Sequence, residues 1–153
     1  KEDNEYYAYY VKRQRITMVK LEFGVTNNKY PEKNISVGQV AIINEYGTET
    51  IPPRPAFRIG LERSVTKNKK LIDAALKNIT NHLLTGRKDS IQRQLTQALT
   101  QIGKSAKKET KDIIKQGSMT PNAPLTIKKK GFDHPLWETG LLHDSVEYLV
   151  SKE

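Results

Sequence analysis

The chain has 153 residues, a formal net charge of +9 and no cysteine. This length fits one domain with a sizeable core, and the lack of cysteine excludes disulfides, thiol nucleophiles and thiolate metal sites. No apolar run approaches the roughly 20 residues of a membrane span, and the opening residues lack the apolar segment of a signal peptide. We expect a single domain over residues 1–153, with 1–12 as a truncated or extended N-terminal segment, and no membrane partner.

The positive charge is concentrated in the middle of the chain. Residues 62–117 hold 13 Lys or Arg against 5 Asp or Glu, a surplus of eight positive charges. Such a surface attracts phosphate backbones and acidic proteins alike. Charge alone therefore leaves both kinds of partner open.

The N-terminal third begins with a predicted strand at residues 13–25. Its apolar alternation slips by one residue between Met18 and Leu21, which predicts a bulge near Val19 and Lys20. The polar residues that follow predict a flexible loop at 26–34.

A short helix is expected next. Ser36 can cap a helix over residues 37–46, and Gly47 can end it in the left-handed conformation. The Ile and Val content of this segment also suits a buried strand, so the helix is the preferred of two interpretations.

Two long amphipathic helices are predicted in the central region. Apolar residues recur at spacings of three and four from 61 to 83 and again from 91 to 113. Gly86 and Gly117 end the two patterns, and Thr110 interrupts the second. The helices should pack as an antiparallel hairpin or lie together across a sheet.

The C-terminal region contains three prolines in residues 118–140, which predict an extended stretch. Residues 141–150 predict a short turn or helix and then a strand able to pair with the first one. The expected fold class is α+β, with a small, mostly antiparallel sheet packed against two long amphipathic helices and extended proline-containing loops.

The residues that usually perform catalysis form no clear set. His82 is expected to be a packed or capping residue, and no pair of histidines has metal-ligand spacing. His143, Asp144 and Ser145 place triad residue types side by side, but no nucleophile elbow surrounds Ser145. Glycine-rich phosphate-binding motifs are absent from the sequence. We expect no enzyme activity, no metal and no cofactor.

Lysines are the best candidates for contact with DNA in a channel or with an acidic partner. The tyrosines near the N-terminus lie among acidic residues, so no platform for stacking bases is evident. The candidates are Lys104, Lys107, Lys108, Lys111, Lys128, Lys129 and Lys130.

The segment "IPPRP" is stiff because Pro52, Pro53 and Pro55 fix their backbone φ angles. Two roles for Arg54 are equally compatible with this. Either the arginine makes an inter-subunit salt bridge, or the segment merely turns the chain toward the long helix. On the first alternative, Arg54→Ala harms assembly more than folding.

Three ordered blocks resemble the bacteriophage tail-completion or head-to-tail joining proteins of long-tailed phages. The blocks read "EYGTETIPPRPAF", "PNAPLTIKKKG" and "HPLWETGLLHDSVEY", and the match spans most of residues 37–150. Departures from the family pattern are Tyr46 for the usual Phe, Ala56 as an extra residue before Phe57, and Trp137 with Glu138 in place of Ile-Asp.

The resemblance implies a non-enzymatic virion protein of the phage neck, assembled in the host cytoplasm. It implies a homo-oligomeric ring, commonly of six subunits, between the head connector and the tail tube or tail terminator protein, with genomic DNA passing through the lumen. The alternative is a nucleic-acid-binding protein that uses the basic segment 62–117. The expected subunit or partner interface comprises Pro53, Arg54, Pro55, Phe57, Pro121, Asn122, Pro124 and Trp137.

Overall fold

The computed structural model describes residues 18–152, except 27, 32–33 and 86–87. Within them the chain has six helices and a two-stranded antiparallel sheet, which confirms the α+β class. The predicted N-terminal segment 1–12, strand residues 13–17 and Gly86 lie outside the described residues. In chain order, the elements are β1 (Val19–Val25), α2 (Val37–Tyr46), α3 (Ala56–Lys67), α4 (Lys69–Leu84), α5 (Lys88–Gln116), α6 (Pro124–Lys130), α7 (Leu141–Ser145) and β2 (Val146–Lys152).

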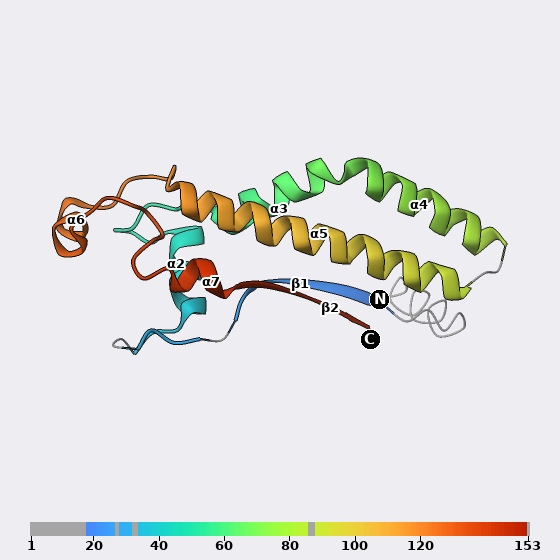
Figure 1. The fold of residues 1–153 in the computed structure, drawn as a ribbon, viewed down its shortest axis with the longest axis horizontal. Coiled ribbons are helices and arrows are strands. Elements are labelled where there is room, and N and C mark those ends of the chain that lie inside the picture. The colour runs from blue at the N-terminus through green and yellow to red at the C-terminus, as the bar shows by residue number, and fades with distance from the viewer. Residues whose placement is uncertain (1–17, 27, 32–33, 86–87, 153) are drawn as a thin grey trace, which may run out of the picture.

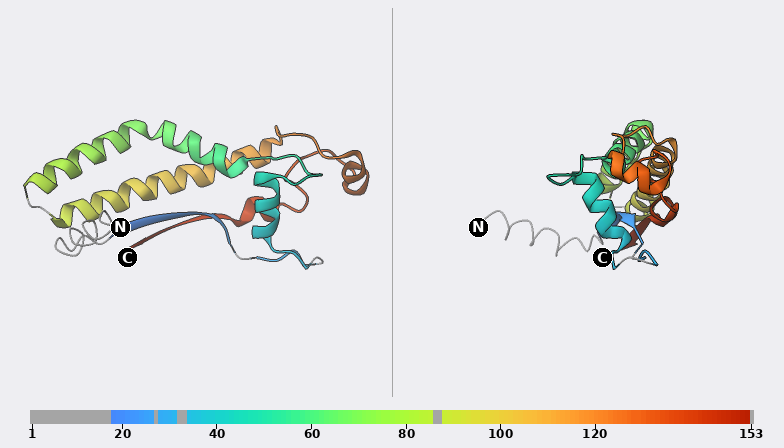
Figure 2. Two further views of the ribbon diagram at one scale, coloured as in Figure 1. Left: turned by 180° about the vertical axis from the view of Figure 1, so that it is seen from behind. Right: turned by 90° about the vertical axis from the view of Figure 1, so that its left-hand side faces the viewer.

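The molecule is elongated and has three layers along most of its length (Figure 1). Helix α5 forms the middle layer, with α3 and α4 on one side and the sheet on the other. Helix α2 runs across one end of the molecule, as both views of Figure 2 show. None of the described helices has the length and apolar character needed to cross a membrane.

The two strands pair as expected, with Leu21 opposite Val150 and Phe23 opposite Tyr148. The predicted bulge near Val19 and Lys20 is wrong, because the pairing is unbroken from Val19 to Val25. The inward-facing alternation starts at Val19, so there is no slip of phase within β1.

The prediction for α2 is confirmed at both ends. The Ser36 hydroxyl accepts a hydrogen bond from the Gln39 amide at 3.1 Å, and the Gln39 side chain accepts one from the Ser36 amide at 2.9 Å. This reciprocal capping box favours a helix over a strand. Gly47 ends α2 with a positive φ of +75°, but its ψ of −176° differs from the expected left-handed helical conformation.

The expected flexible loop at 26–34 is partly structured. The Tyr30 amide donates to the Ile35 carbonyl at 3.2 Å, and the Val37 amide donates to the Asn28 carbonyl at 2.9 Å. A β-bridge also joins Lys29 to Ser36. These backbone bonds hold the entrance to α2 in place.

The first predicted long helix is two helices, α3 and α4, with a bend between them (Figure 1). Asn68 stands at the junction with φ −99° and ψ 11°. Its side-chain amide donates to the Ser64 carbonyl at 2.8 Å, which ties the end of α3 to the turn. A polar side chain that bonds to its own helix is a common cause of such a bend.

Small residues, and not the predicted apolar stripe, form the buried face of α3. Ala56, Gly60 and Ser64 are buried, whereas Leu61 and Val65 are exposed. A Cβ atom on Gly60 would lie 2.0 Å from Thr110 Oγ1. Thr110 is therefore a close-packed contact between α3 and α5, where the sequence suggested only an interruption of the stripe.

The stretch 118–140 was expected to be extended, but it contains α6. Pro124 occupies the first turn and Gly131 ends the helix with φ +82°. Proline at the start and glycine after the end are typical helix boundaries. The expected turn or helix followed by a strand is confirmed by α7 and β2.

The core lies where α2, α7 and the adjoining ends of α3 and α5 meet. Phe23, Phe57 and Trp137 pack against its edge. In contrast, no residue of α4 is buried. The buried cluster comprises Val37, Ala41, Ala56, Ile113, Ile114, Leu142 and Val146.

Candidate interaction surface

Three segments that are far apart in the sequence meet at the end of the molecule that carries α2, α6 and α7 (Figure 1). Residues 45–57 connect α2 to α3, residues 121–131 contain α6, and residues 134–148 contain α7 and the start of β2. They correspond to the three sequence blocks. We call this part of the molecule the motif end.

Arg54 joins the first block to the second. It is only 6% exposed. Its Nε donates to the Thr120 carbonyl at 2.7 Å, and Nη2 donates to the Pro121 carbonyl at 2.8 Å. Nη1 donates to Asn44 Oδ1 at 3.3 Å. Burial lowers the pKa of the guanidinium, and the nearby Asp133 carboxylate opposes this effect.

The structure gives Arg54 a role beyond the two alternatives considered from the sequence, because its side chain bonds to other parts of its own chain. Each of its three side-chain nitrogens has an intramolecular acceptor. Arg54 is therefore an internal brace between the first and second blocks. The proline-restrained backbone turns Arg54 toward carbonyls that lie 66 and 67 residues further along the chain.

Glu45 positions the start of α3. Its carboxylate accepts hydrogen bonds from the Phe57 amide at 3.0 Å and from the Arg58 amide at 2.8 Å. Pro55, at the N-cap, provides no side-chain acceptor. Because the amides of a first helical turn lack partners within the helix, a carboxylate from the preceding helix supplies the missing cap.

The connection between α2 and α3 projects from the motif end (Figure 2, right). Gly47 begins it, and a Cβ atom there would lie 2.7 Å from the Ile51 carbonyl. Pro53 is exposed, so it stays available to a partner. Phe57 instead packs against Phe23, with ring centroids 5.8 Å apart.

The second block holds α6 away from the rest of the molecule. Asp133 Oδ1 accepts hydrogen bonds from the backbone amide and the side-chain amide of Asn122, at 3.0 and 2.9 Å. This contact closes the loop around α6. No residue of α6 is buried, and Pro121 and Pro124 are exposed. Of the expected interface residues of this block, Asn122 therefore makes an internal structural contact, whereas Pro121 and Pro124 lie on the exposed surface.

The third block is fixed to α5 by His134. Its Nε2 lies 3.0 Å from the Ile114 carbonyl, so this nitrogen carries the proton and donates. The Trp137 ring lies 5.7 Å from that of His134 and 5.3 Å from that of His143. Trp137 is half-buried between the two histidines and contributes to packing at the motif end.

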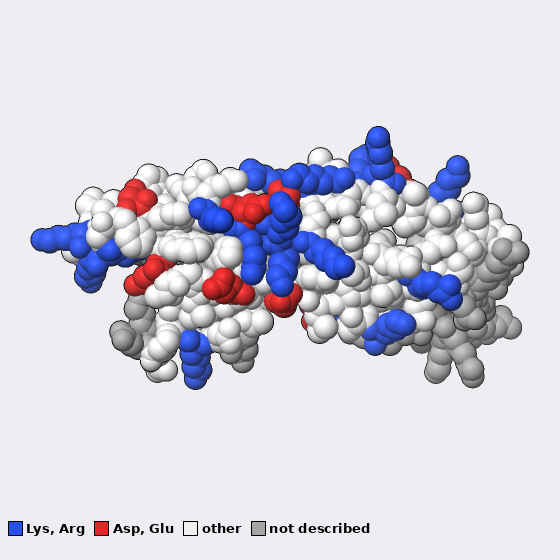
Figure 3. Space-filling model, viewed as in Figure 1, with Lys and Arg blue, Asp and Glu red and all other residues white. Residues whose placement is uncertain are grey.

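The candidate lysines of α5 are partly engaged in ion pairs. Lys107 Nζ lies 2.7 Å from Glu147 Oε2 on β2, and Lys108 Nζ lies 2.8 Å from Asp112 Oδ2. Lys104 is exposed and Lys111 is half-buried. Figure 3 shows Lys and Arg side chains gathered over the middle of the molecule with carboxylates among them.

The α6 lysines form a second basic group at the tip of the motif end. Lys128 and Lys129 are exposed. Lys130 donates from Nζ to the His134 carbonyl at 2.8 Å and lies over the Phe132 ring. Burial lowers the Lys130 pKa. All three lysines stand in the last turn of α6, where positive charge is favoured by the helix dipole.

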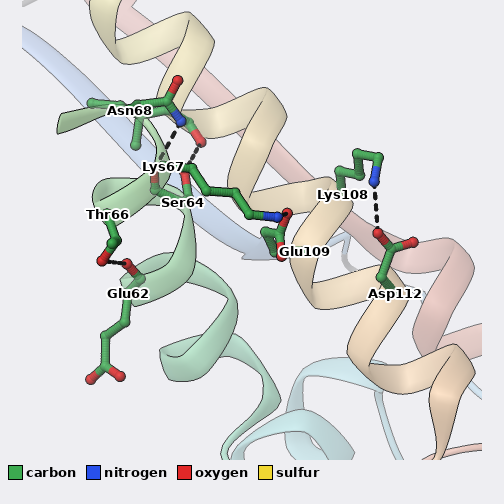
Figure 4. A network of polar contacts seen from close by, with 9 residues as sticks. Glu62, Ser64, Thr66, Lys67, Asn68, Lys108, Glu109 and Asp112 are labelled. Carbon is green, nitrogen blue, oxygen red and sulfur yellow. Dashed lines mark hydrogen bonds and ion pairs between the residues drawn. The ribbon is translucent and has the colours of Figure 1, made fainter. Parts of the chain in front are cut away.

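A polar network connects the end of α3 to α5 (Figure 4). The Lys67 ammonium pairs with the buried carboxylate of Glu109. Ser64 Oγ donates to the Ile102 carbonyl at 2.8 Å. These contacts hold the two helices together. The positive charge of Lys67 is therefore explained by its pairing with Glu109 and does not require a nucleic-acid partner.

The triad residue types do not form a catalytic arrangement. His143 Nδ1 lies 2.7 Å from Asp144 Oδ1, but Ser145 is buried and its hydroxyl accepts a hydrogen bond from the Asn28 side chain at 3.3 Å. His82 bridges α4 and α5 through Asn78 and Ser90, as a packed histidine would. In the part of the chain that the structure describes, no group of His, Asp or Glu side chains is arranged to hold a metal ion.

Several residues that shape this surface were not identified from the sequence. Asn44, directly before the first block, and Glu45, within it, were not assigned a role, and Asp133 was not singled out. Their partners are backbone groups or loop residues 10 to 13 positions away. Such contacts leave no periodic pattern in the sequence.

Comparisons of the chain with protein-family models, with curated proteins and with solved structures found no match.

Proposed function

We propose that this chain is a structural virion protein of the phage neck, whose subunits form a ring that joins the head connector to the tail tube. The observation that carries the proposal is that three family-like sequence blocks form one continuous end of the molecule. Arg54 connects the first block to the second through the Thr120 and Pro121 carbonyls. Residues that act together in assembly are expected to lie on one surface.

The proposal includes the finer fold expected of the family. Helices α3 and α4 act as one bent helix that pairs with α5, and the small sheet packs against the opposite side of α5. The exposed Pro53 and Pro121 lie on loops and the exposed Pro124 lies at the start of α6. These restrained positions can contact a neighbour without large losses of conformational entropy. A ring closes when one surface of each subunit binds a different surface of the next.

The proposed partners are further copies of the chain, the head connector protein, and the tail tube or tail terminator protein. Genomic DNA passes through the lumen of the proposed ring. The protein is then non-enzymatic and is located in the virion neck after assembly in the host cytoplasm.

Electron microscopy of the purified full chain, alone and mixed with tail tube protein, tests the proposal. We expect two-dimensional class averages with closed rings in at least one of the two samples. An unrelated protein of similar charge in place of the tube protein controls for nonspecific association. Monomers in both samples contradict the proposal.

The alternative, a nucleic-acid-binding protein, is favoured only by the exposed lysines. It is weakened because Lys67, Lys107 and Lys108 already pair with carboxylates. Binding to DNA at low salt that weakens with a slope of about −0.9 per neutralised phosphate supports this alternative. No binding at low salt excludes it.

A further inference from the structure

The two strands of the sheet each have an outer edge, and the hydrogen-bond register shows which backbone groups point toward it. The Thr26 amide donates to the Ser145 carbonyl at 2.8 Å, and the pairing continues without a break to Val19 opposite Lys152. Because hydrogen-bonded pairs alternate along an antiparallel ladder, the even-numbered residues of β1 bond to β2. The odd-numbered residues of β1 therefore direct their N–H and C=O groups away from β2.

The outer edge of β1 is open in the part of the chain that the structure describes. Apart from the ladder itself, no hydrogen bond from a described residue reaches the outward-pointing backbone groups. The side chains of the same residues face α5, where a Cβ atom on Gly103 would lie 3.0 Å from Leu21 Cδ1. These side chains are only half-buried. The residues are Val19, Leu21, Phe23 and Val25.

The outer edge of β2 is partly closed. The Val146 amide donates to the His143 carbonyl, and the Tyr148 amide donates to Glu147 Oε1 at 3.1 Å. Charged side chains are a common protection of edge strands against further pairing. Among the described residues, no such contact covers the backbone of β1, so β1 is the edge that can accept another strand.

The open edge of β1 has a defined length. At its C-terminal end, β1 runs into the motif end, where it contacts α2 (Figure 1). Val25 packs there against the buried cluster. The stretch with room for another strand is therefore residues 19–23, and its centre is Leu21.

The charged residues of β1 fit a second copy of the same strand. Lys20 and Glu22 are exposed on the face away from α5, with Lys20 Nζ 3.0 Å from Glu22 Oε1. An antiparallel partner centred on Leu21 places Lys20 opposite Glu22 of the second copy, and Glu22 opposite its Lys20. Centring the pair on Lys20 or on Glu22 instead puts two like charges directly opposite each other, which is destabilising.

The same register pairs apolar residues on the face toward α5. Leu21 lies opposite Leu21 of the second copy, and Val19 lies opposite Phe23. Aromatic and β-branched residues form stabilising pairs across strands. Such pairing also covers apolar side chains that are half-buried in the single chain.

Other charged residues near the sheet do not select the register. Glu147 of β2 pairs with Lys107 of α5 at 2.7 Å. Lys152 lies at the end of β2, on the far side of β1 from an added strand, and Lys104 is an exposed residue of α5. Because none of these residues lies on β1, the choice among registers depends on Lys20 and Glu22.

We propose that β1 of one copy pairs antiparallel with β1 of a second copy, centred on Leu21, to form one continuous four-stranded sheet. A sheet of more than two strands is more stable than a single pair of strands. Such a twofold contact joins copies in pairs and does not by itself close a ring. The inference therefore goes beyond the proposed neck function and does not rest on it.

Charge reversal tests the pairing, with sedimentation of the full chain as the measure of self-association. We expect the natural chain to form dimers. Lys20→Glu and Glu22→Lys should each weaken the dimer about tenfold or more, because each places like charges opposite each other at two positions. An equimolar mixture of the two variants should recover the natural affinity to within about threefold, because opposite charges then meet at both positions.

A matched control reverses an exposed ion pair elsewhere. Lys69 Nζ lies 2.9 Å from Asp73 Oδ2 in α4, on the opposite side of α5 from the sheet (Figure 1). Lys69→Glu and Asp73→Lys should leave self-association unchanged, alone or mixed. Equal effects of Lys20→Glu and Lys69→Glu, or no recovery on mixing the two β1 variants, overturn the proposal.

Disulfide formation provides a second test, because the natural chain has no cysteine. In the proposed register, residues 20 and 22 of the two copies form a non-hydrogen-bonded pair with Cα atoms about 4.5 Å apart, within reach of a disulfide. Under mild oxidation, a mixture of Lys20→Cys and Glu22→Cys proteins should give mainly the heterodimer. A heterodimer yield equal to that of random pairing overturns the proposal.

The remaining outcomes concern the occupant of the edge. A chain that stays monomeric at every concentration overturns the proposal. A monomeric chain whose binding to tail tube protein is weakened by Lys20→Glu also overturns it, because the edge then accepts a strand of another protein. The neck function is judged separately, by the presence of rings in electron microscopy.

Discussion

The motif end and helix α4 differ in whether their apolar side chains are buried. At the motif end, helices from four parts of the chain surround a buried cluster that includes Ile114 and Val146. In α4, Leu71, Leu76 and Leu83 are all exposed, and no residue is buried. Both regions contain apolar residues at helical spacing, so periodicity alone does not determine burial. Burial depends on how many other elements pack around the helix.

This difference implies an uneven distribution of stability. A segment with few buried contacts opens at a lower free energy than the core does. The motif end is therefore expected to be stable in the single chain, whereas α4 should gain stability from a neighbour.

The largest expected effect comes from truncating the core. Ile114→Ala should lower the free energy of unfolding by about 2–5 kcal/mol, because Ile114 is fully buried and the change leaves a cavity. Leu76→Ala, in α4, should lower the free energy of unfolding by less than about 1 kcal/mol, because this side chain is already 56% exposed. Urea denaturation of dilute protein measures both. Equal losses of unfolding free energy in the two variants would contradict the expected difference in stability between the motif end and α4.

Loss of the arginine brace should come next. Arg54→Ala leaves the Thr120 and Pro121 carbonyls without their donor and should cost about 2–4 kcal/mol. Arg54→Lys should recover part of this, because one ammonium cannot reproduce a planar fork. The exposed Arg58 offers a matched control, with an expected change below about 0.5 kcal/mol for Arg58→Ala. A thermal midpoint unaffected by Arg54→Ala would show that the brace is not needed for folding.

Overpacking of the α3–α5 contact should have a smaller effect. Gly60→Ala places a methyl group against Thr110 and should destabilise the protein by about 1–3 kcal/mol. Gly24→Ala is the control, because a Cβ atom there has no neighbour within 4 Å. Denaturation curves that coincide for the two variants would argue against the close helix contact.

The smallest expected effect concerns acid stability. The hydrogen bond from Lys107 lowers the Glu147 pKa below its ordinary value of 4.5. Because the folded-state pKa is the lower one, this stabilisation is present above about pH 4.5 and is lost as pH falls through the lowered pKa. The pair is partly exposed, so the effect is small. Glu147→Gln should flatten the acid side of the stability profile, and an unchanged profile would exclude this contribution.

The local features of the fold were predictable from the sequence. Strand alternation gave the pairing of β1 with β2, and Ser36 with Gly47 gave both ends of α2. The start and end of α6 were also encoded, by Pro124 and Gly131, although the three prolines favoured an extended interpretation. These signals lie within a few residues of the structure they determine.

The long-range features were not predictable. Arg54 bonds to carbonyls of Thr120 and Pro121, and any residue type supplies a carbonyl. The contact of Gly60 with Thr110 depends on how two helices approach, which no single pattern specifies. The exposure of Ile42 in α2 and Leu71 in α4 likewise became visible only in the structure, because both resemble core residues in the sequence.

Hydrogen exchange of the full chain, measured by mass spectrometry in the monomer and in the assembled state, tests the contrast between the two regions most directly. We predict that in the monomer the amides of α4 exchange much faster than those of residues 106–114 in α5. On assembly, exchange in α4 should slow, whereas that in 106–114 should stay the same. Equal protection of α4 and 106–114 in the monomer, or no change in α4 on assembly, would contradict the account.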